Sequence, residues 1–177
     1  MTTLITILLA IAGIIALLLI TALFMKREHY VNCEIIINAP RQKVFDFLKL
    51  IKNQDQFNKW ATTDKENRKE EFKGTDGTVG FIYAWSGNKD AGEGEKEIKN
   101  LIEGKRIETE IRFVRPMRVS ASVTFVMESL PDNQTKVNMI NTGTLNYPLN
   151  IMIPMVEKNF PKDMDASLST LKNILEK

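Results

Sequence analysis

The chain opens with a long run of apolar residues and changes character after Met25. Its 24 basic and 22 acidic side chains all follow Met25, and only Gly13 and four threonines interrupt the apolar run before it. At about 1.5 Å rise per residue, residues 4–25 form a helix of roughly 33 Å, slightly longer than the ~30 Å hydrocarbon core of a bilayer. The pattern predicts one transmembrane helix, within an anchor of residues 1–25.

A cleavable signal peptide is the alternative for this segment. Such a peptide needs a positive n-region, a shorter apolar core and small residues at its cleavage site. The run carries no Lys or Arg, and it ends in Leu23 and Phe24, which are bulky. We therefore expect an uncleaved anchor. Lys26 and Arg27 follow it directly, so the positive-inside rule predicts that the remainder lies in the cytoplasm. We expect a single-pass protein, of a bacterial inner membrane.

The next pattern predicts a strand followed by two helices. Apolar residues alternate over residues 30–37, which is typical of a strand with one buried face. Pro40 can occupy the first turn of a helix. Val44, Phe45, Leu48 and Ile51 follow at helical spacing and predict a helix that ends at about residue 51. A second, short helix is expected at residues 55–60.

From residue 69 the apolar period becomes two, and turn residues separate five or six successive strands. The strands are marked by alternating residues at Val79, Phe81, Tyr83 and Trp85; at Ile107, Thr109, Ile111 and Phe113; at Val119, Ala121, Val123, Phe125 and Met127; and at Val137 and Met139. Short connections between such strands predict an antiparallel meander. Each strand has one apolar face, so another element must cover the sheet.

The covering element is an amphipathic C-terminal helix. Its apolar residues recur every three or four positions at Phe160, Met164, Leu168, Leu171 and Leu175, with Pro161 and Asp163 suited to the first turn. The sequence thus predicts one α+β domain at residues 30–177, a curved antiparallel sheet of about seven strands around a long helix. The spacer, residues 26–29, reaches at most about 15 Å, so the domain must lie against the lipid headgroups.

Several motifs in this order resemble the START-like, or SRPBCC, superfamily, which includes polyketide cyclase/dehydrase-like proteins. They are Ile37-Asn38-Ala39-Pro40, Val44-Phe45-Asp46-Phe47-Leu48, Trp60, Gly77-Thr78-Val79-Gly80 with Trp85, and Leu168-Ser169-Thr170-Leu171-Lys172. The resemblance implies a helix-grip fold with a cavity between sheet and helix that commonly receives an apolar ligand. The anchor is an addition to the family's core, and Pro154 interrupts the apolar run 145–156 where a continuous helix would be expected.

The predicted cavity gives a set of candidate ligand-binding residues. They are Trp60, Phe81, Tyr83, Trp85, Ile111, Phe113, Phe125, Met139, Met155 and Met164. Aromatic residues with polar tips are common in ligand pockets, although they also fill cores. The run 145–156 is too short and too interrupted by proline to span a membrane. It could be buried under the sheet, or it could form a lid that faces lipid and admits a ligand from the bilayer.

The sequence offers little catalytic or metal-binding chemistry. His29 is the only histidine and lies at the membrane junction, where an interfacial position accounts for it. Cys33 is the only cysteine, and no carboxylates cluster as metal ligands, so we expect no metal and no cofactor. Acidic residues interleave the basic ones, which argues against nucleic acid as a partner. Glu95 and Glu97 share one strand face, opposite to Lys96 and Ile98.

Three functions remain open on the sequence. The first is a membrane-tethered binding or transfer module that holds a lipid- or isoprenoid-like molecule. The second is a cyclase or dehydratase in which Glu95, Glu97 or Tyr83 transfers protons, which requires these groups to converge in the pocket with perturbed pKa values. The third is a protein-interaction domain recruited to the membrane.

Overall fold

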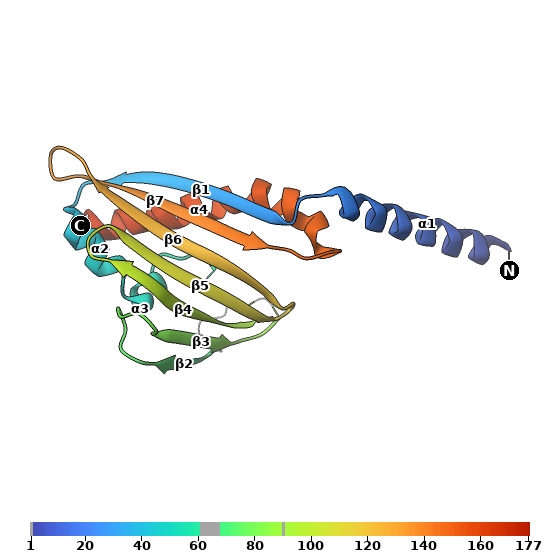
Figure 1. The fold of residues 1–177 in the computed structure, drawn as a ribbon, viewed down its shortest axis with the longest axis horizontal. Coiled ribbons are helices and arrows are strands. Elements are labelled where there is room, and N and C mark those ends of the chain that lie inside the picture. The colour runs from blue at the N-terminus through green and yellow to red at the C-terminus, as the bar shows by residue number, and fades with distance from the viewer. Residues whose placement is uncertain (1, 61–67, 90) are drawn as a thin grey trace.

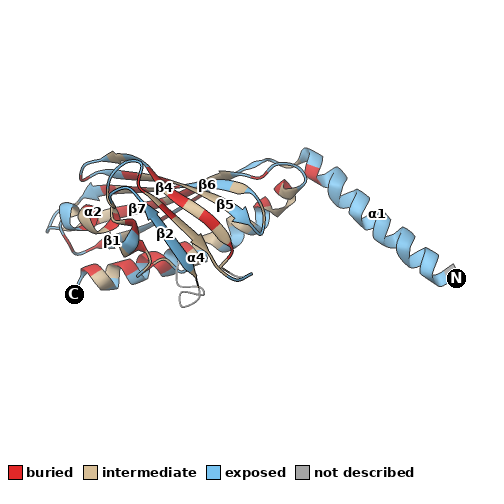
Figure 2. Cartoon of the chain, turned by 90° about the horizontal axis from the view of Figure 1, so that it is seen from below, coloured by how far each residue is buried: buried red, intermediate tan, exposed pale blue. Residues whose placement is uncertain are grey.

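The computed structural model describes residues 2–60, 68–89 and 91–177, and it begins with an isolated apolar helix. Helix α1 (Thr2–Phe24) projects from one end of the domain (Figure 1). Of residues 3–24, Ala22 alone is buried, and the other side chains of the helix are exposed (Figure 2). The core helix of a soluble protein would be mostly buried. Helix α1 is long and apolar enough to cross a membrane.

The domain is built on one antiparallel sheet. Its strands are β1 (Glu28–Ile37), β2 (Lys69–Lys73), β3 (Ile82–Ser86), β4 (Glu93–Ile102), β5 (Arg106–Arg115), β6 (Val119–Ser129) and β7 (Thr135–Thr144). The order across the sheet is β1-β7-β6-β5-β4-β3-β2. Strands β2 to β7 therefore pair in sequence, and β1 closes the order beside β7. The predicted meander and its strand number are confirmed.

Helices cover one face of this sheet. Helix α4 (Ile153–Leu175) runs along β1, while α2 (Arg41–Leu48) and α3 (Ile51–Gln54) lie at the end of the sheet farther from α1 (Figure 1). A short 3₁₀ helix, η1 (Leu149–Met152), precedes α4. We call the sheet face toward α4 the inner face, the opposite one the outer face, and the end of the sheet away from α1 the far end.

The core lies between α4 and the inner face. Its largest cluster joins Met164, Leu168, Leu171 and Leu175 of α4 to Phe125, Val137 and Met139 of the sheet and to Val44, Phe45 and Leu48 of α2. A second cluster contains Ile51, Phe81, Tyr83 and Ile98. Both clusters consist of the residues that alternation and helical spacing predict to face inward.

The two short helices differ from their predicted bounds. Helix α2 ends at Leu48, and the second helix begins at Ile51 rather than at residue 55, because Leu50 is extended with φ −81° and ψ 109°. The carboxylate of Asp76 accepts hydrogen bonds from the main-chain N–H of Ile51 (2.8 Å) and of Lys52 (3.2 Å). It thereby satisfies the free N–H groups of a new helix start from a distant part of the chain.

The starts of α4 and β3 also differ from the predicted ones. Helix α4 begins at Ile153, and Pro154 occupies its first turn instead of interrupting it, so Pro161 lies inside the helix and not at its start. Strand β3 begins only at Ile82, because Gly80 adopts a positive φ of 86° that ends the extended chain before it. Asp90 lies outside the described residues.

Candidate functional site

Helix α1 passes into the domain without a free linker. The main-chain N–H of Leu145 donates to the carbonyl of Arg27 (2.8 Å), and Lys26 forms an ion pair with Glu157 of α4 (2.7 Å). Strand β1 already begins at Glu28, inside the predicted spacer. The segment 145–156 is neither wholly buried nor wholly a lid: η1 packs against the end of α1, while Tyr147 and Met155 are exposed.

One row of residues crosses the inner face near α1. Successive strand partners place the following side chains next to one another, and we call them the inner row: His29, Gly143, Ala121, Ile111, Lys96 and Tyr83. The row contains the polar groups His29 and Lys96 on either side of small or aliphatic residues. All six positions point toward the side on which α4 lies.

Burial decreases in the middle of the inner row. The next row toward the far end consists of Val31, Asn141, Val123, Thr109 and Ile98, and every member is buried. In the inner row His29, Lys96 and Tyr83 are still buried, but Gly143, Ala121 and Ile111 between them are only partly buried, and nearer to α1 so are Trp85 and Phe113. The inner face is therefore incompletely covered from the middle of the inner row toward α1.

Aromatic rings border this uncovered part of the inner face. On the sheet, Trp85 stacks on Tyr83 and meets Phe113 edge to face, each at a centroid distance of 5.8 Å. On the helix side, Phe160 of α4 contacts His29 at 6.2 Å and Trp60 at 5.5 Å. Rings thus lie on both the sheet and the helix, which is an arrangement suited to an apolar guest.

The ten predicted ligand-binding residues fall into three groups. Trp85, Ile111 and Phe113 lie in or beside the inner row and are partly buried, while Tyr83 lies in that row but is buried in the second core cluster. Phe81, Phe125, Met139 and Met164 are buried in the two core clusters. Trp60 and Met155 are exposed, and Trp60 touches Phe160. The structure therefore brings part of the set together, and ligand binding by any of them stays a prediction.

Lys96 is a candidate that the sequence analysis passed over. Its side chain is 7% exposed, and its ammonium donates a short hydrogen bond to the Oε1 of Gln54 on α3. Burial lowers the pKa of Lys96 to about 8, while the negative charge of Asp55 opposes that shift. Lys96 lies two residues before the buried Ile98 and therefore points to the same face of β4. This alternation is the sequence signal that indicates its burial.

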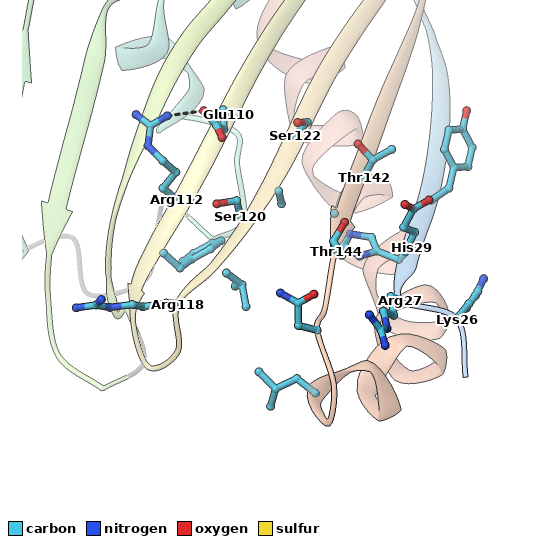
Figure 3. A pocket seen from close by; sticks show the side chains of 18 of the residues that line it. Lys26, Arg27, His29, Glu110, Arg112, Arg118, Ser120, Ser122, Thr142 and Thr144 are labelled. Atoms are coloured by element: carbon cyan, nitrogen blue, oxygen red, sulfur yellow. Dashed lines mark hydrogen bonds and ion pairs between the residues drawn. The ribbon is translucent and has the colours of Figure 1, made fainter. Parts of the chain in front are cut away.

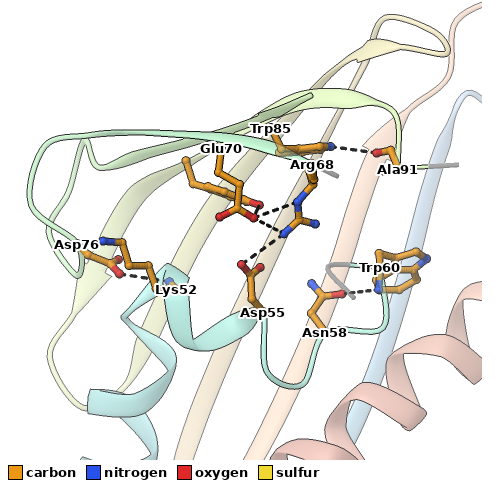
Figure 4. Close-up of polar contacts among 10 residues, drawn as sticks. Lys52, Asp55, Asn58, Trp60, Arg68, Glu70, Asp76, Trp85 and Ala91 are labelled. Atoms are coloured by element: carbon orange, nitrogen blue, oxygen red, sulfur yellow. Dashed lines mark hydrogen bonds and ion pairs between the residues drawn. The ribbon is translucent and has the colours of Figure 1, made fainter. Parts of the chain in front are cut away.

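A charged network includes Tyr83, the strand partner of Lys96. Figure 4 shows its members Arg68, Glu70 and Asp55. Arg68 forms ion pairs with Glu70 (2.6 Å) and Asp55 (3.5 Å). The hydroxyl of Tyr83 donates to the same Glu70 carboxylate at 2.9 Å. Burial, with the negative charge of Asp55, raises the pKa of Tyr83 well above its usual value, so this phenol is a hydrogen-bond donor and not a base at neutral pH.

Glu95 and Glu97 share a face as predicted, but it is the outer one. Arg112 donates from Nε to Glu95 (2.7 Å) and from Nη2 to Glu97 (2.7 Å), and it also binds Glu110. The hydrogen bond from Arg112 lowers the pKa of Glu97. Both carboxylates thus lie across the sheet from Tyr83, which corrects the idea that the three groups converge as proton-transfer residues.

His29 belongs to β1 rather than to an interfacial spacer, and Cys33 lies in β1 as predicted. His29 is 7% exposed, and its Nε2 lies 2.8 Å from the Oδ1 of Asn141. Its Nδ1 is buried and has no hydrogen-bond partner among the described residues. Burial raises the pKa of the Cys33 thiol to about 11. The described residues contain no group of three or more His, Cys, Asp or Glu that could hold a metal ion.

A broad hollow lies on the outer face, beside the point where α1 enters the domain (Figure 3). We call this open hollow of about 1200 Å³ the outer groove. Its floor includes Thr142 and Ser122, which pair with each other and with Tyr30 and Glu110 on the flanking strands. Its lining combines hydroxyl and charged side chains with apolar ones such as Val114, Val119 and Leu149, and it also includes His29, Gly143 and Ala121 of the inner row.

Solved structures resemble the domain closely in shape. Hypothetical protein jhp0584 from Helicobacter pylori gives a TM-score of 0.63 at 11% identity, with 83% of this chain and 88% of that chain covered. Ara h 8.0201 gives 0.59 at 14% identity, with 84% and 97% covered. The chain has the helix-grip fold. The Aha1 dimer from Colwellia psychrerythraea gives 0.56 at 19% identity, with 83% and 96% covered.

At these identities the likeness establishes the helix-grip fold alone. No family sequence model and no curated protein sequence matches the chain.

Proposed function

We propose that the chain is a membrane-tethered helix-grip module that holds a small apolar molecule, lipid- or isoprenoid-like, on the inner face of its sheet near α1. In this proposal residues 1–25 are the anchor and residues 30–177 the binding domain, which faces the cytoplasm. The observation that carries the proposal is the step in burial at the inner row. A core packed throughout would bury Ala121 and Ile111 as completely as it buries Val123 and Thr109.

The side chains around Ala121 suit an apolar guest with one polar group. Phe113 and Trp85 lie on the sheet side and Phe160 on the helix side. His29 offers an unpartnered Nδ1, and the ammonium of Lys96 has more donor hydrogens than its one contact to Gln54 uses. A guest oxygen could therefore hydrogen-bond at either end of the inner row, while its hydrocarbon part displaces water from the rings.

The membrane tether would bring the binding site close to a source of apolar guests. With α1 in a bilayer, the short junction keeps the inner row close to the membrane, so a lipid-soluble guest reaches the site at high effective concentration. Transfer over a short distance also spares the guest from crossing water. The resemblance to the START-like superfamily, whose cavity commonly receives an apolar ligand, agrees with this assignment.

Quenching of tryptophan fluorescence tests the proposal. The chain has two tryptophans, Trp60 and Trp85, and both lie near the uncovered face. We expect a bromine-labelled fatty acid to quench the full chain in lipid nanodiscs. Ala121→Leu should reduce the quenching because its larger side chain fills the inner row.

Ala84→Leu is the matched control, because Ala84 is also half-buried but lies on β3 between inward-facing Tyr83 and Trp85, and so points outward. This variant should quench like the parent chain. The proposal fails if the parent chain is not quenched, or if both variants are quenched to the same extent as the parent.

A further inference from the structure

The outer groove has a floor of hydroxyl groups whose side chains make no hydrogen bond within the described part of the chain. Ser122 on β6 and Thr142 on β7 are direct partners, and Ser120 and Thr144 lie two residues nearer α1 on the same face. Hydroxyls both donate and accept hydrogen bonds. The centre of the groove can therefore bind a polar group of either kind.

Two guanidinium groups of the groove lack an acidic partner among the described residues. Arg112 is held by three glutamates and Lys26 by Glu157, so their charges are already compensated. Arg27 and Arg118 are exposed and form no such ion pair. They come from opposite boundaries of the groove, the α1 junction and the turn between β5 and β6 (Figure 3). Free guanidinium groups pair well with phosphate oxygens.

Acidic groups complete the lining. Glu28 stands opposite Thr144, and Glu110 stands opposite Ser122. A carboxylate accepts hydrogen bonds but repels a bare anion, so the groove suits a phosphate that also carries donor groups, such as hydroxyls or an amine. Glu110 already accepts from Arg112, and inorganic phosphate alone would leave the Glu28 carboxylate unused.

The groove opens where α1 meets the domain. Its boundary includes Lys26 and Arg27, which follow the last residues of α1, and Leu149 of η1. If α1 crosses a bilayer, these residues lie at the level of the lipid phosphates. The close hydrogen bonding of the junction holds the groove in that position.

We propose that the outer groove binds the phosphate-bearing headgroup of a membrane lipid, with Arg27 and Arg118 attracting the phosphate from the two boundaries and the Ser and Thr hydroxyls on the headgroup's polar groups. The Ser and Thr side chains of this site point to the face opposite the inner-row side chains, although His29, Gly143 and Ala121 border the groove as well, and its ligand chemistry is different. It goes beyond the proposed function and shares with it only the placement of α1 in a bilayer.

Lipid retention by the full chain tests the site. The chain is reconstituted in vesicles of equal parts phosphatidylglycerol and phosphatidylcholine, extracted in mild detergent, and examined by native mass spectrometry. We expect retained phosphatidylglycerol, whose headgroup carries hydroxyl donors, in preference to phosphatidylcholine, whose headgroup has none. The preference should be lost in the double variant Arg27→Gln, Arg118→Gln.

The matched control is Lys73→Gln, Lys105→Gln, which removes the same charge from strand ends away from α1 and should keep the preference. Ile111→Phe, which changes the inner row at a residue outside the lining of the groove, should keep it too and so separates the two sites. Equal retention of both lipids by the parent chain, or equal loss in both double variants, overturns the proposal. Soluble glycerol phosphate that displaces the lipid at low concentration would assign the groove to a free phosphate compound and overturn the lipid assignment.

Discussion

Asn150 donates hydrogen bonds from its side-chain Nδ2 to the main-chain carbonyl of Ala22 at 2.6 Å, joining the start of the last helix region to the end of the first helix. The same nitrogen lies 3.1 Å from the carbonyl of Met25. Both carbonyls belong to the end of α1, where helical carbonyls lack partners within the helix. Asn150 is fully buried, so this contact fixes the direction in which α1 leaves the domain.

Asn150→Ala should loosen this junction. The two carbonyls would be left without their donor in a buried site, at a cost of about 1 to 3 kcal/mol. We expect faster hydrogen exchange over residues 22–28 of the full chain. Asn146→Ala, in the same loop but exposed, should leave exchange there unchanged. Unchanged exchange in the Asn150 variant would show that the junction does not depend on this side chain.

The Arg112 cluster on the outer face should stabilise the sheet in a pH-dependent manner. Arg112→Ala would leave Glu95, Glu97 and Glu110 facing one another, and we expect a loss of roughly 1 kcal/mol at neutral pH, since the groups are partly exposed. The lowered pKa of Glu97 stabilises the folded state above the ordinary glutamate pKa. The loss should therefore shrink as the pH falls below that value.

Chemical denaturation at neutral pH and at low pH measures this difference. Arg115→Ala provides the comparison, because Arg115 makes a single exposed ion pair with Glu93 and should have a smaller effect. A cost of Arg112→Ala that stays constant across the pH range would contradict the explanation.

Lys96 should oppose folding at neutral pH. Its pKa is about 8 in the folded state against an ordinary value of 10.5, so the unfolded chain binds more protons between these values. The stability of the parent chain should thus rise with pH from about 8 to 10.5, relative to a chain without this amine. Lys96→Met should be more stable at pH 7 by up to about 3 kcal/mol, an advantage that disappears by pH 10.5.

Denaturation of both chains across this pH range isolates the Lys96 contribution as their difference. A difference that does not depend on pH would mean that the amine keeps its ordinary pKa, through contacts stronger than the one to Gln54.

Local patterns predicted most of the fold. Alternation placed Val123, Phe125 and Met127 on the inner face, and the turn at Asp132 and Asn133 has the positive φ angles (58° and 62°) that a tight hairpin needs. The helix boundaries failed where a distant residue decides them. The residues near Ile51 do not predict that the distant Asp76 caps a helix there.

The candidate site was less predictable than the fold. Alternation gives the face of each residue but not the position along the strand at which burial stops, so Phe125 and Phe113 looked equivalent although one is buried and the other is not. Whether Lys96 is solvated depends on α3, which supplies Gln54. The outer groove depends on the register that sets Ser122 beside Thr142, and no single strand reveals that pairing.

The position of a bound guest tests the central claim most directly. A crystal structure of the full chain with a bromine-labelled fatty acid would locate the bromine by its anomalous scattering. Our account predicts a bromine peak on the inner face near Ala121, between Phe113 and Phe160. Bromine found only along α1 or in the outer groove, with the inner row empty, would contradict it.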